Sequence, residues 1–133
     1  KAAMLDRYGG PAGVLHASAH LALAADTTEQ AEKILRTTMP GWLARTGEYR
    51  LVDDNPPRRR DLAAYLDHLL AIHPVGPPQR CLERLTATLD ATGTRRLLLM
   101  VEGAGDPDAT TGNIHRLGAE VLPPLRARMR TRA

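Results

Sequence analysis

Residues 14–31, VLHASAHLALAADTTEQA, contain the pattern on which the fold depends. Odd-numbered positions from Leu15 to Leu23 carry only Leu and Ala, and this alternation is typical of a β-strand with one apolar face. The even-numbered positions at the start are polar: His16, Ser18 and His20. Thr27 and Gln30 are spaced as a capping box directly after the strand, so a helix follows. Strand and helix in immediate succession indicate an α/β fold.

The same order of strand and helix recurs twice toward the C-terminus. A short extended piece over 73–76 precedes a helix predicted from about 78 to 91. The apolar run 96–101 precedes the glycine-rich loop 103–105 and another helix, and such a run is typical of a strand buried on both faces. We therefore predict three parallel strands in the spatial order 17–24, 73–76 and 96–101, each followed by a helix.

Prolines suggest where the helices stop, because proline lacks a backbone donor and clashes with the preceding turn. The first helix should kink or end at Pro40, and the last should stop at Pro123 and Pro124. Another helix is predicted over 58–72, after a polar, turn-rich excursion at 46–57 that is a candidate lid. The last helix should bury Ile114, Leu117, Val121 and Leu122.

Composition excludes several classes of protein. The chain has 133 residues, 43% of them apolar and 25% charged, as in an ordinary globular domain. Cys81 is the single cysteine, so an internal disulfide and a cysteine-rich zinc site are excluded, and we expect a cytoplasmic protein and a buried, unreactive thiol. No apolar run is long enough for a membrane span. Aromatic residues make up only 3%, which argues against a nucleic-acid partner despite the net charge of +3.

Three strands do not make a finished domain, since an open sheet of this width leaves unpaired edges and an uncovered face. The chain also begins with Lys1 rather than Met. We therefore expect residues 1–133 to be a single partial domain. Its partner would be the missing N-terminal half or a second subunit, and a homo-oligomer is expected.

Three segments, in order, resemble the luciferase-like flavin-dependent monooxygenases. Residues 20–31 resemble the family's apolar strand ending in Ala-Asp-Thr, 73–85 its Val-Gly-Ser/Thr-Pro segment, and 96–125 its last strand, loop and helix. The chain departs from the pattern at Pro77, where Ser or Thr is usual, and at Gln79, where an acid is common. The resemblance implies the C-terminal portion, about three βα units, of a TIM (β/α)8 barrel.

The resemblance also implies a cofactor and a place for it. The family uses reduced FMN and oxygen on a small organic substrate, or the deazaflavin coenzyme F420 for hydride transfer. Active sites of such barrels lie at the carboxyl ends of the strands. The candidate cofactor-binding residues are Gly76, Gly103 and Gly105, whose backbone can approach a cofactor closely, and the candidate pocket residues are His20 and Glu102. No catalytic residue and no metal site is assigned.

Each candidate also has a structural interpretation. The glycines at 103 and 105 suit a plain turn, His20 suits a hydrogen-bonded interior histidine, and Glu102 suits a partner for loop amides. For the whole chain, the alternative is a non-catalytic half-barrel that pairs its open sheet with another chain. That module would have lost the cofactor. If the resemblance carries function, we expect the chain alone to be inactive and to bind a flavin weakly or not at all.

Overall fold

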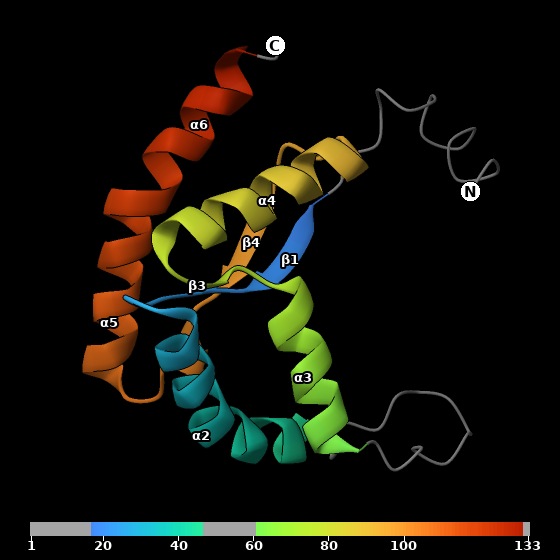
Figure 1. Ribbon diagram of the computed structural model, residues 1–133, viewed down its shortest axis with the longest axis vertical. Coiled ribbons are helices and arrows are strands. Elements are labelled where there is room, and N and C mark those ends of the chain that lie inside the picture. Colours follow the sequence, from blue (N-terminus) through green and yellow to red (C-terminus); the bar gives the residue numbers. More distant parts are fainter. Residues whose placement is uncertain (1–16, 47–60, 132–133) are drawn as a thin grey trace, which may run out of the picture.

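The computed structural model describes residues 17–46 and 61–131 (Figure 1). Its elements, in chain order, are β1 (Ser18–Leu21), β2 (Leu23–Ala24), α2 (Thr28–Thr46), α3 (Leu62–Ile72), β3 (Val75–Gly76), α4 (Pro78–Thr92), β4 (Leu97–Met100), the short 3-10 helix η2 (Glu102–Ala104), α5 (Pro107–Arg116), the π-helical segment η3 (Leu117–Val121) and α6 (Leu122–Thr131). His16, the candidate lid after Thr46 and the predicted helix start at 58–60 lie outside the described residues.

The predicted first strand is divided at Ala22 and pairs with a different strand on each side. β1 pairs with β4 and β2 with β3, both in parallel, which confirms the predicted direction. The N–H groups of Ser18 and Ala22 donate toward β4, whereas those of Leu23 and Ala25 donate toward β3. Successive N–H groups of a strand point to opposite edges, so the first strand lies between the other two. The predicted order, with 73–76 in the middle, is wrong.

β3 is an edge strand because its own sequence limits its pairing. Pro74 and Pro77 flank its two residues, and proline is confined to edges and ends of sheets because it cannot donate to a ladder. The carbonyl groups of Pro74 and Gly76 accept from the first strand. The carbonyl of Val75 accepts instead from Nε of Arg80 at 3.1 Å, so a side chain of the next helix occupies it.

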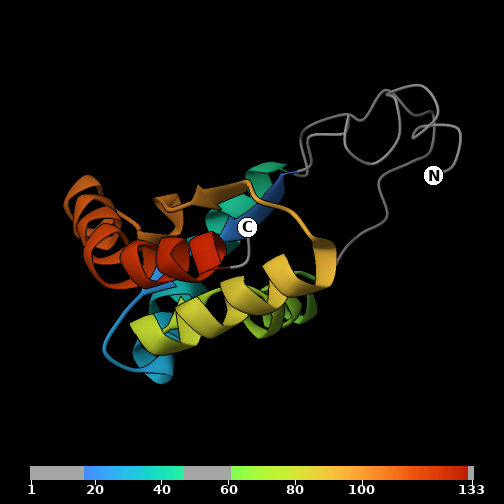
Figure 2. The ribbon, with the colours of Figure 1, turned by 90° about the horizontal axis from the view of Figure 1, so that it is seen from above.

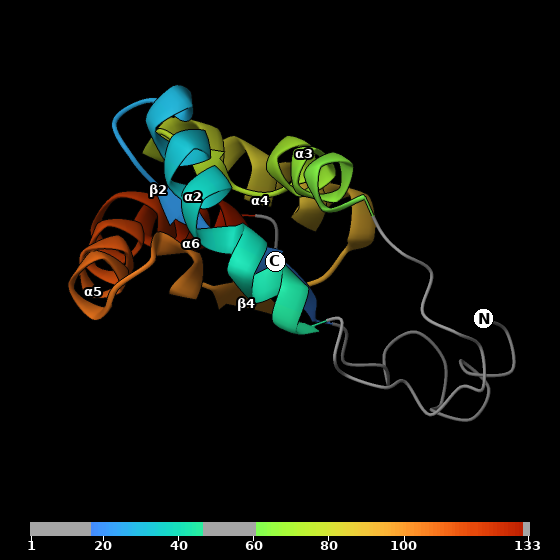
Figure 3. The same ribbon diagram turned by 90° about the horizontal axis from the view of Figure 1, so that it is seen from below.

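Helices cover both faces of the strands. The first crossover, through α2 and α3, leads from the central strand to β3, and the second, through α4, leads back across it to β4. Right-handed crossovers in opposite directions place their helices on opposite faces. Accordingly, Leu21 and Leu23 pack with α2 and α3, and Ala22 and Ala24 with α4, η3 and α6. Figure 2 shows α4 and α6 side by side, and in Figure 3 α2 crosses in front of the strands.

This arrangement changes the expected environment of the polar side of the first strand. Ser18 and His20, the second of which is a candidate pocket residue, lie on this polar side. The same face continues with Ala22 and Ala24, which are buried against Cys81 and the rest of α4. The face is therefore part of a core within the described residues.

The prolines do not end the helices. α2 continues past Pro40 to Thr46, with the predicted change of axis visible in Figure 1. The prediction that Pro123 and Pro124 stop the last helix is wrong, because α5, η3 and α6 form one helical column (Figure 1). A π-helical segment shifts the hydrogen-bond pattern by one residue directly before both prolines, so their missing donors fall where the regular ladder is already interrupted.

Two burial predictions are also wrong. β4 is not buried on both faces, since Leu98 is 62% exposed. On that face α2 covers only the end of the strand at Met100. On α5, Ile114 is 51% exposed and its neighbour Asn113 takes the buried position instead. The predicted burial of Cys81 is confirmed, and it lies on the inward face of α4 with Leu82 and Leu85. Among the helices of the described ranges, none has the length and apolar character needed to cross a membrane.

Candidate functional site

The carboxyl ends of the strands form a rim with two levels. The last residue of β4, Met100, pairs with Leu21, whereas the central strand runs on to Ala24, which pairs with Gly76. Three residues of strand correspond to about 10 Å. The loops after β3 and β4 therefore leave the sheet at different heights.

Helix α2 contacts both loops and shows how far apart they are. Thr28, in its first turn, lies against Gly76. Thr38 lies against Gly105, and its hydroxyl donates to the Gly103 carbonyl at 2.6 Å. Ten helical residues span about 15 Å. Gly76 thus lies apart from the other two candidate glycines.

At the β3 corner, both the backbone conformation and the neighbouring side chains require a glycine at position 76. Its φ of +129° is one that side-chain-bearing residues rarely adopt. A Cβ there would lie 2.9 Å from Cδ of Arg80 and 3.0 Å from Oγ1 of Thr28. The close approach of these two side chains brings a guanidinium group next to the start of α4.

The start of α4 differs from the other helix starts at this rim. Thr27 accepts from the Gln30 N–H before α2, and Asp106 accepts from the Ala109 N–H at the start of α5. Pro77, before α4, makes no side-chain capping bond. Of the α-helices that the structure describes as starting at this rim, α4 is the one whose first N–H groups are not covered by a capping side chain, which favours an anion there.

At the β4 corner, three candidate residues lie together. Glu102, Gly103 and Gly105 line a cavity of about 100 Å3 with residues of α2 and β4, namely Thr38, Met39, Trp42 and Met100. Packing explains Gly103, because a Cβ there would lie 2.8 Å from Cδ2 of Leu35. Gly105 has a φ of +115°. The groups that a ligand could contact at this corner are therefore the backbone of Gly105 and the exposed side chain of Glu102.

Asn113 fills the gap between the two levels, and sequence reasoning missed it. Its side-chain Oδ1 accepts from the Ala24 N–H at 3.0 Å, and its Nδ2 donates to the Ala22 carbonyl at 2.9 Å and to the Val101 carbonyl at 3.5 Å. The amide thereby replaces the peptide group that β4 no longer supplies. The available signal was its spacing, since 113, 117, 121 and 125 form one helical stripe and only the first is polar.

A surface ion-pair network borders this gap. Nη2 of Arg116 lies 2.8 Å from Oδ1 of Asp26, which follows β2, and its Nε lies 3.0 Å from Oε1 of Glu120. The hydrogen bond to Asp26 and the charge of Glu120 outweigh partial desolvation and raise the pKa of Arg116. The loop after β2 is therefore tied to α5 and not left open.

His20 lies within β1, below the rim. It is 7% exposed, its Nε2 is 2.9 Å from the Ser18 hydroxyl, and its Nδ1 is 3.4 Å from Nδ1 of His73. The two rings are perpendicular, with centroids 5.5 Å apart. Burial lowers the pKa of both histidines, and the positive charges of His20 and His68 lower that of His73 further. This geometry matches the structural interpretation, a hydrogen-bonded interior histidine.

The size of the rim cavity limits what it holds. Small-molecule sites usually measure about 300 to 1,000 Å3. At about 100 Å3, the cavity beside Glu102 is one part of a flavin site at most. Within 17–46 and 61–131, no group of three potential metal-ligating side chains comes together.

Sequence comparison supports the resemblance found in the three segments. The alkanal monooxygenase alpha chain of Photorhabdus laumondii is 29% identical over 72 residues, which are 54% of this chain and 20% of that protein. That of Photorhabdus luminescens is 28% identical over 72 residues, with the same shares. The match thus spans a fifth of the length of these relatives. No family model matches the chain.

Structural comparison confirms the fold class. The oxygenating constituent of 3,6-diketocamphane monooxygenase from the CAM plasmid of Pseudomonas putida, a type II Baeyer-Villiger monooxygenase solved with FMN, superposes with a TM-score of 0.52 and 23% identity. The superposition covers 81% of this chain and 33% of that one. The described strands and helices therefore correspond to part of a TIM-barrel-like fold.

Proposed function

We infer that this chain is a part of a luciferase-like flavin-dependent monooxygenase, and we propose that it supplies the last three strand–helix units of an FMN site. The observation that carries the proposal is the superposition of 81% of the chain on an FMN-bound oxygenase, together with its sequence similarity to alkanal monooxygenase alpha chains. Because the matches span 20% and 33% of those proteins, the proposed enzyme requires further barrel units. We propose that a longer protein or a second subunit supplies them.

The start of α4 is the part of the rim best suited to the FMN phosphate. Its first N–H groups have no side-chain cap, Gly76 allows close backbone approach, and the Arg80 side chain lies against Gly76. A helix N-terminus and a guanidinium group both favour an anion. Glu102, Gly103 and Gly105 would provide a separate part of the wall.

The cofactor and the chain have different tasks in the proposed reaction. Reduced FMN, when bound, would supply the two electrons with which oxygen is activated, so that one oxygen atom enters a small organic substrate and the other leaves as water. The chain positions the phosphate at α4 and closes one side of the site with Trp42 and the loop after β4. The proposal gives His20 no role at this rim, because His20 lies within β1.

Titration with FMN tests the proposal on this chain and on the longer protein that the proposal predicts or, if a second subunit supplies the further units, on the complex with that subunit. We expect the longer protein to quench FMN fluorescence and this chain to bind at least about tenfold more weakly, because its cavity is small. Arg80→Gln in the longer protein should weaken FMN binding by about tenfold, whereas the matched change Arg84→Gln, one turn further along α4, should leave it within about twofold. Absence of FMN binding by the longer protein would refute the enzyme assignment.

A further inference from the structure

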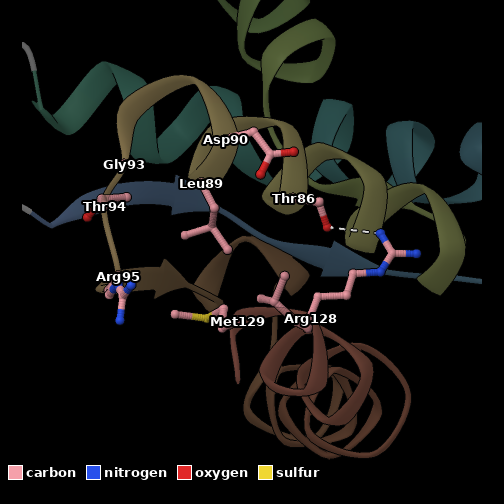
Figure 4. A pocket seen from close by; sticks show the side chains of 9 residues that line it. Thr86, Leu89, Asp90, Gly93, Thr94, Arg95, Arg128 and Met129 are labelled. Atoms are coloured by element: carbon pink, nitrogen blue, oxygen red, sulfur yellow. Dashed lines mark hydrogen bonds between the residues drawn. The ribbon is translucent and has the colours of Figure 1, made fainter. Parts of the chain in front are cut away.

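A second cavity lies at the end of the sheet opposite to the rim. It measures about 250 Å3 and lies between the last turns of α4, the loop that leads into β4, and α6 (Figure 4). The residues of that loop, Thr94 and Arg95, precede β4, so the cavity is at the amino end of the strands. No part of the proposed FMN site contributes to it.

The floor of this cavity is apolar. Leu89 of α4 and Met129 of α6 point into the space between the two helices in Figure 4, and the buried Leu125 completes the floor. α4 ends at Gly93, which has a φ of +67° and nothing within 4 Å of the position of a Cβ. The chain therefore turns away at this point and leaves the space between the helices accessible.

The rim of the cavity carries more positive than negative charge. Arg95 and Arg128 line it, with Asp90 as the lining carboxylate. Nη1 of Arg128 donates to the Thr86 hydroxyl at 3.3 Å, so α6 is connected to α4 across one end of the cavity (Figure 4). Arg130, on the same helix as Arg128, adds to the positive potential. This charge favours an anionic ligand.

We propose that this cavity binds a small amphipathic carboxylate, with its hydrocarbon part over Leu89, Leu125 and Met129 and its head at Arg128, while Arg95 at the other end of the cavity adds to the positive potential. The planar guanidinium group binds a carboxylate through two parallel hydrogen bonds. A volume of 250 Å3 corresponds to about eight water molecules, which suits a medium-length chain and excludes FMN or a long lipid. The site is a second binding site, independent of the proposed FMN function.

Calorimetric titration of the chain with octanoate tests this proposal. Octanoate should bind, octan-1-ol should bind at least about tenfold more weakly, and octylamine should not bind, because the basic rim selects an anion. Arg128→Gln should weaken octanoate binding by about tenfold, and Met129→Trp, which fills the cavity, should abolish it. Arg126→Gln is the matched control on α6, because Arg126 does not line the cavity, and should leave binding within about twofold.

Two results would overturn the proposal. One is the absence of octanoate binding at millimolar concentration, and the other is equal binding of octanoate and octan-1-ol together with no effect of Arg128→Gln. If Arg128→Gln unfolds the chain by circular dichroism, the comparison of octanoate with octan-1-ol and the Met129→Trp variant decide the proposal without a change at Arg128.

Discussion

At the scale of single residues, Asn113 shows how one side chain allows the sheet to divide. The first strand changes its pairing partner at Ala22, from β4 to β3. Beyond the last residue of β4, the Ala22 carbonyl and the Ala24 N–H have no partner on a strand that the structure describes. A buried backbone group without a hydrogen-bond partner costs free energy, so Asn113, a polar residue in an otherwise apolar helical stripe, supplies the missing hydrogen bonds. Its two hydrogen-bonding ends match the two groups of the strand.

Removal of this amide should destabilise the chain strongly. Asn113→Ala leaves the Ala22 carbonyl and the Ala24 N–H unpaired in a buried place, at a cost of about 2 to 4 kcal/mol in the free energy of unfolding. Ile114→Ala, at the exposed neighbouring position, should change it by about 0.5 kcal/mol or less. Urea unfolding followed by circular dichroism measures both, and equal losses would contradict the role given to Asn113.

The His20–His73 pair should make stability depend on pH. Both folded pKa values lie below the ordinary value of 6.5, chiefly because of burial. As pH falls below about 6.5, the unfolded chain binds protons that these folded histidines do not, so the free energy of unfolding should decrease. Above that pH the effect should vanish.

Urea unfolding between pH 7.5 and 5 checks this dependence. His73→Asn should reduce the loss on acidification, because it removes one of the two groups and the second charge beside His20. His115→Asn, at an exposed position on α5, should lose stability as the original chain does. An unchanged pH profile in His73→Asn would contradict the assignment.

At the scale of secondary-structure elements, close packing decides where the loop after β4 lies. η2 is pressed onto α2, with Gly103 in contact with Leu35 and Leu21 and its carbonyl bonded to Thr38. This contact brings the predicted cofactor loop against α2, so packing explains the glycine at position 103. The remaining opening is the small cavity at Glu102 and Gly105.

Two glycine-to-alanine changes should have opposite signs. Gly103→Ala places a Cβ 2.8 Å from Leu35 and should cost about 1 to 3 kcal/mol of stability through overpacking. Gly112→Ala, in α5, meets no atom within 4 Å and should stabilise the chain by about 0.5 to 1 kcal/mol, because alanine loses less conformational freedom in a helix. Thermal unfolding of both variants provides the comparison, and a stable Gly103→Ala would refute the packing argument.

At the scale of the whole molecule, the strand order leaves β4 at an edge. The carbonyl groups of Arg96 and Met100 accept from the central strand, so the alternate backbone groups, those of Leu97 and Leu99, point to the other edge. Among the described strands none pairs there. Together with the exposed Leu98, this edge is the surface at which further barrel units or a second subunit would add.

The chain alone should therefore associate through β4. We expect sedimentation to show dimers or larger species, and Leu98→Lys to shift them toward monomer by several-fold, because a charge on an edge strand opposes pairing. Ile114→Lys, on an equally accessible apolar residue of α5, is the control and should not shift the distribution. A compact monomer at high concentration would count against this surface.

The local patterns of the sequence determined the elements, because alternation, capping residues and helical stripes act over a few neighbours. They predicted the parallel strands, the start of α2 and the burial of Cys81. Contacts between distant segments decided the rest: the place of the first strand at the centre, the burial of Asn113 in place of Ile114, and the separation of Gly76 from Gly103 and Gly105. The prolines that flank β3 already indicate an edge strand in the sequence. Which strand then lies between the other two depends on pairings between residues far apart in the chain, because each strand offers two edges and the local pattern does not say which partner occupies them.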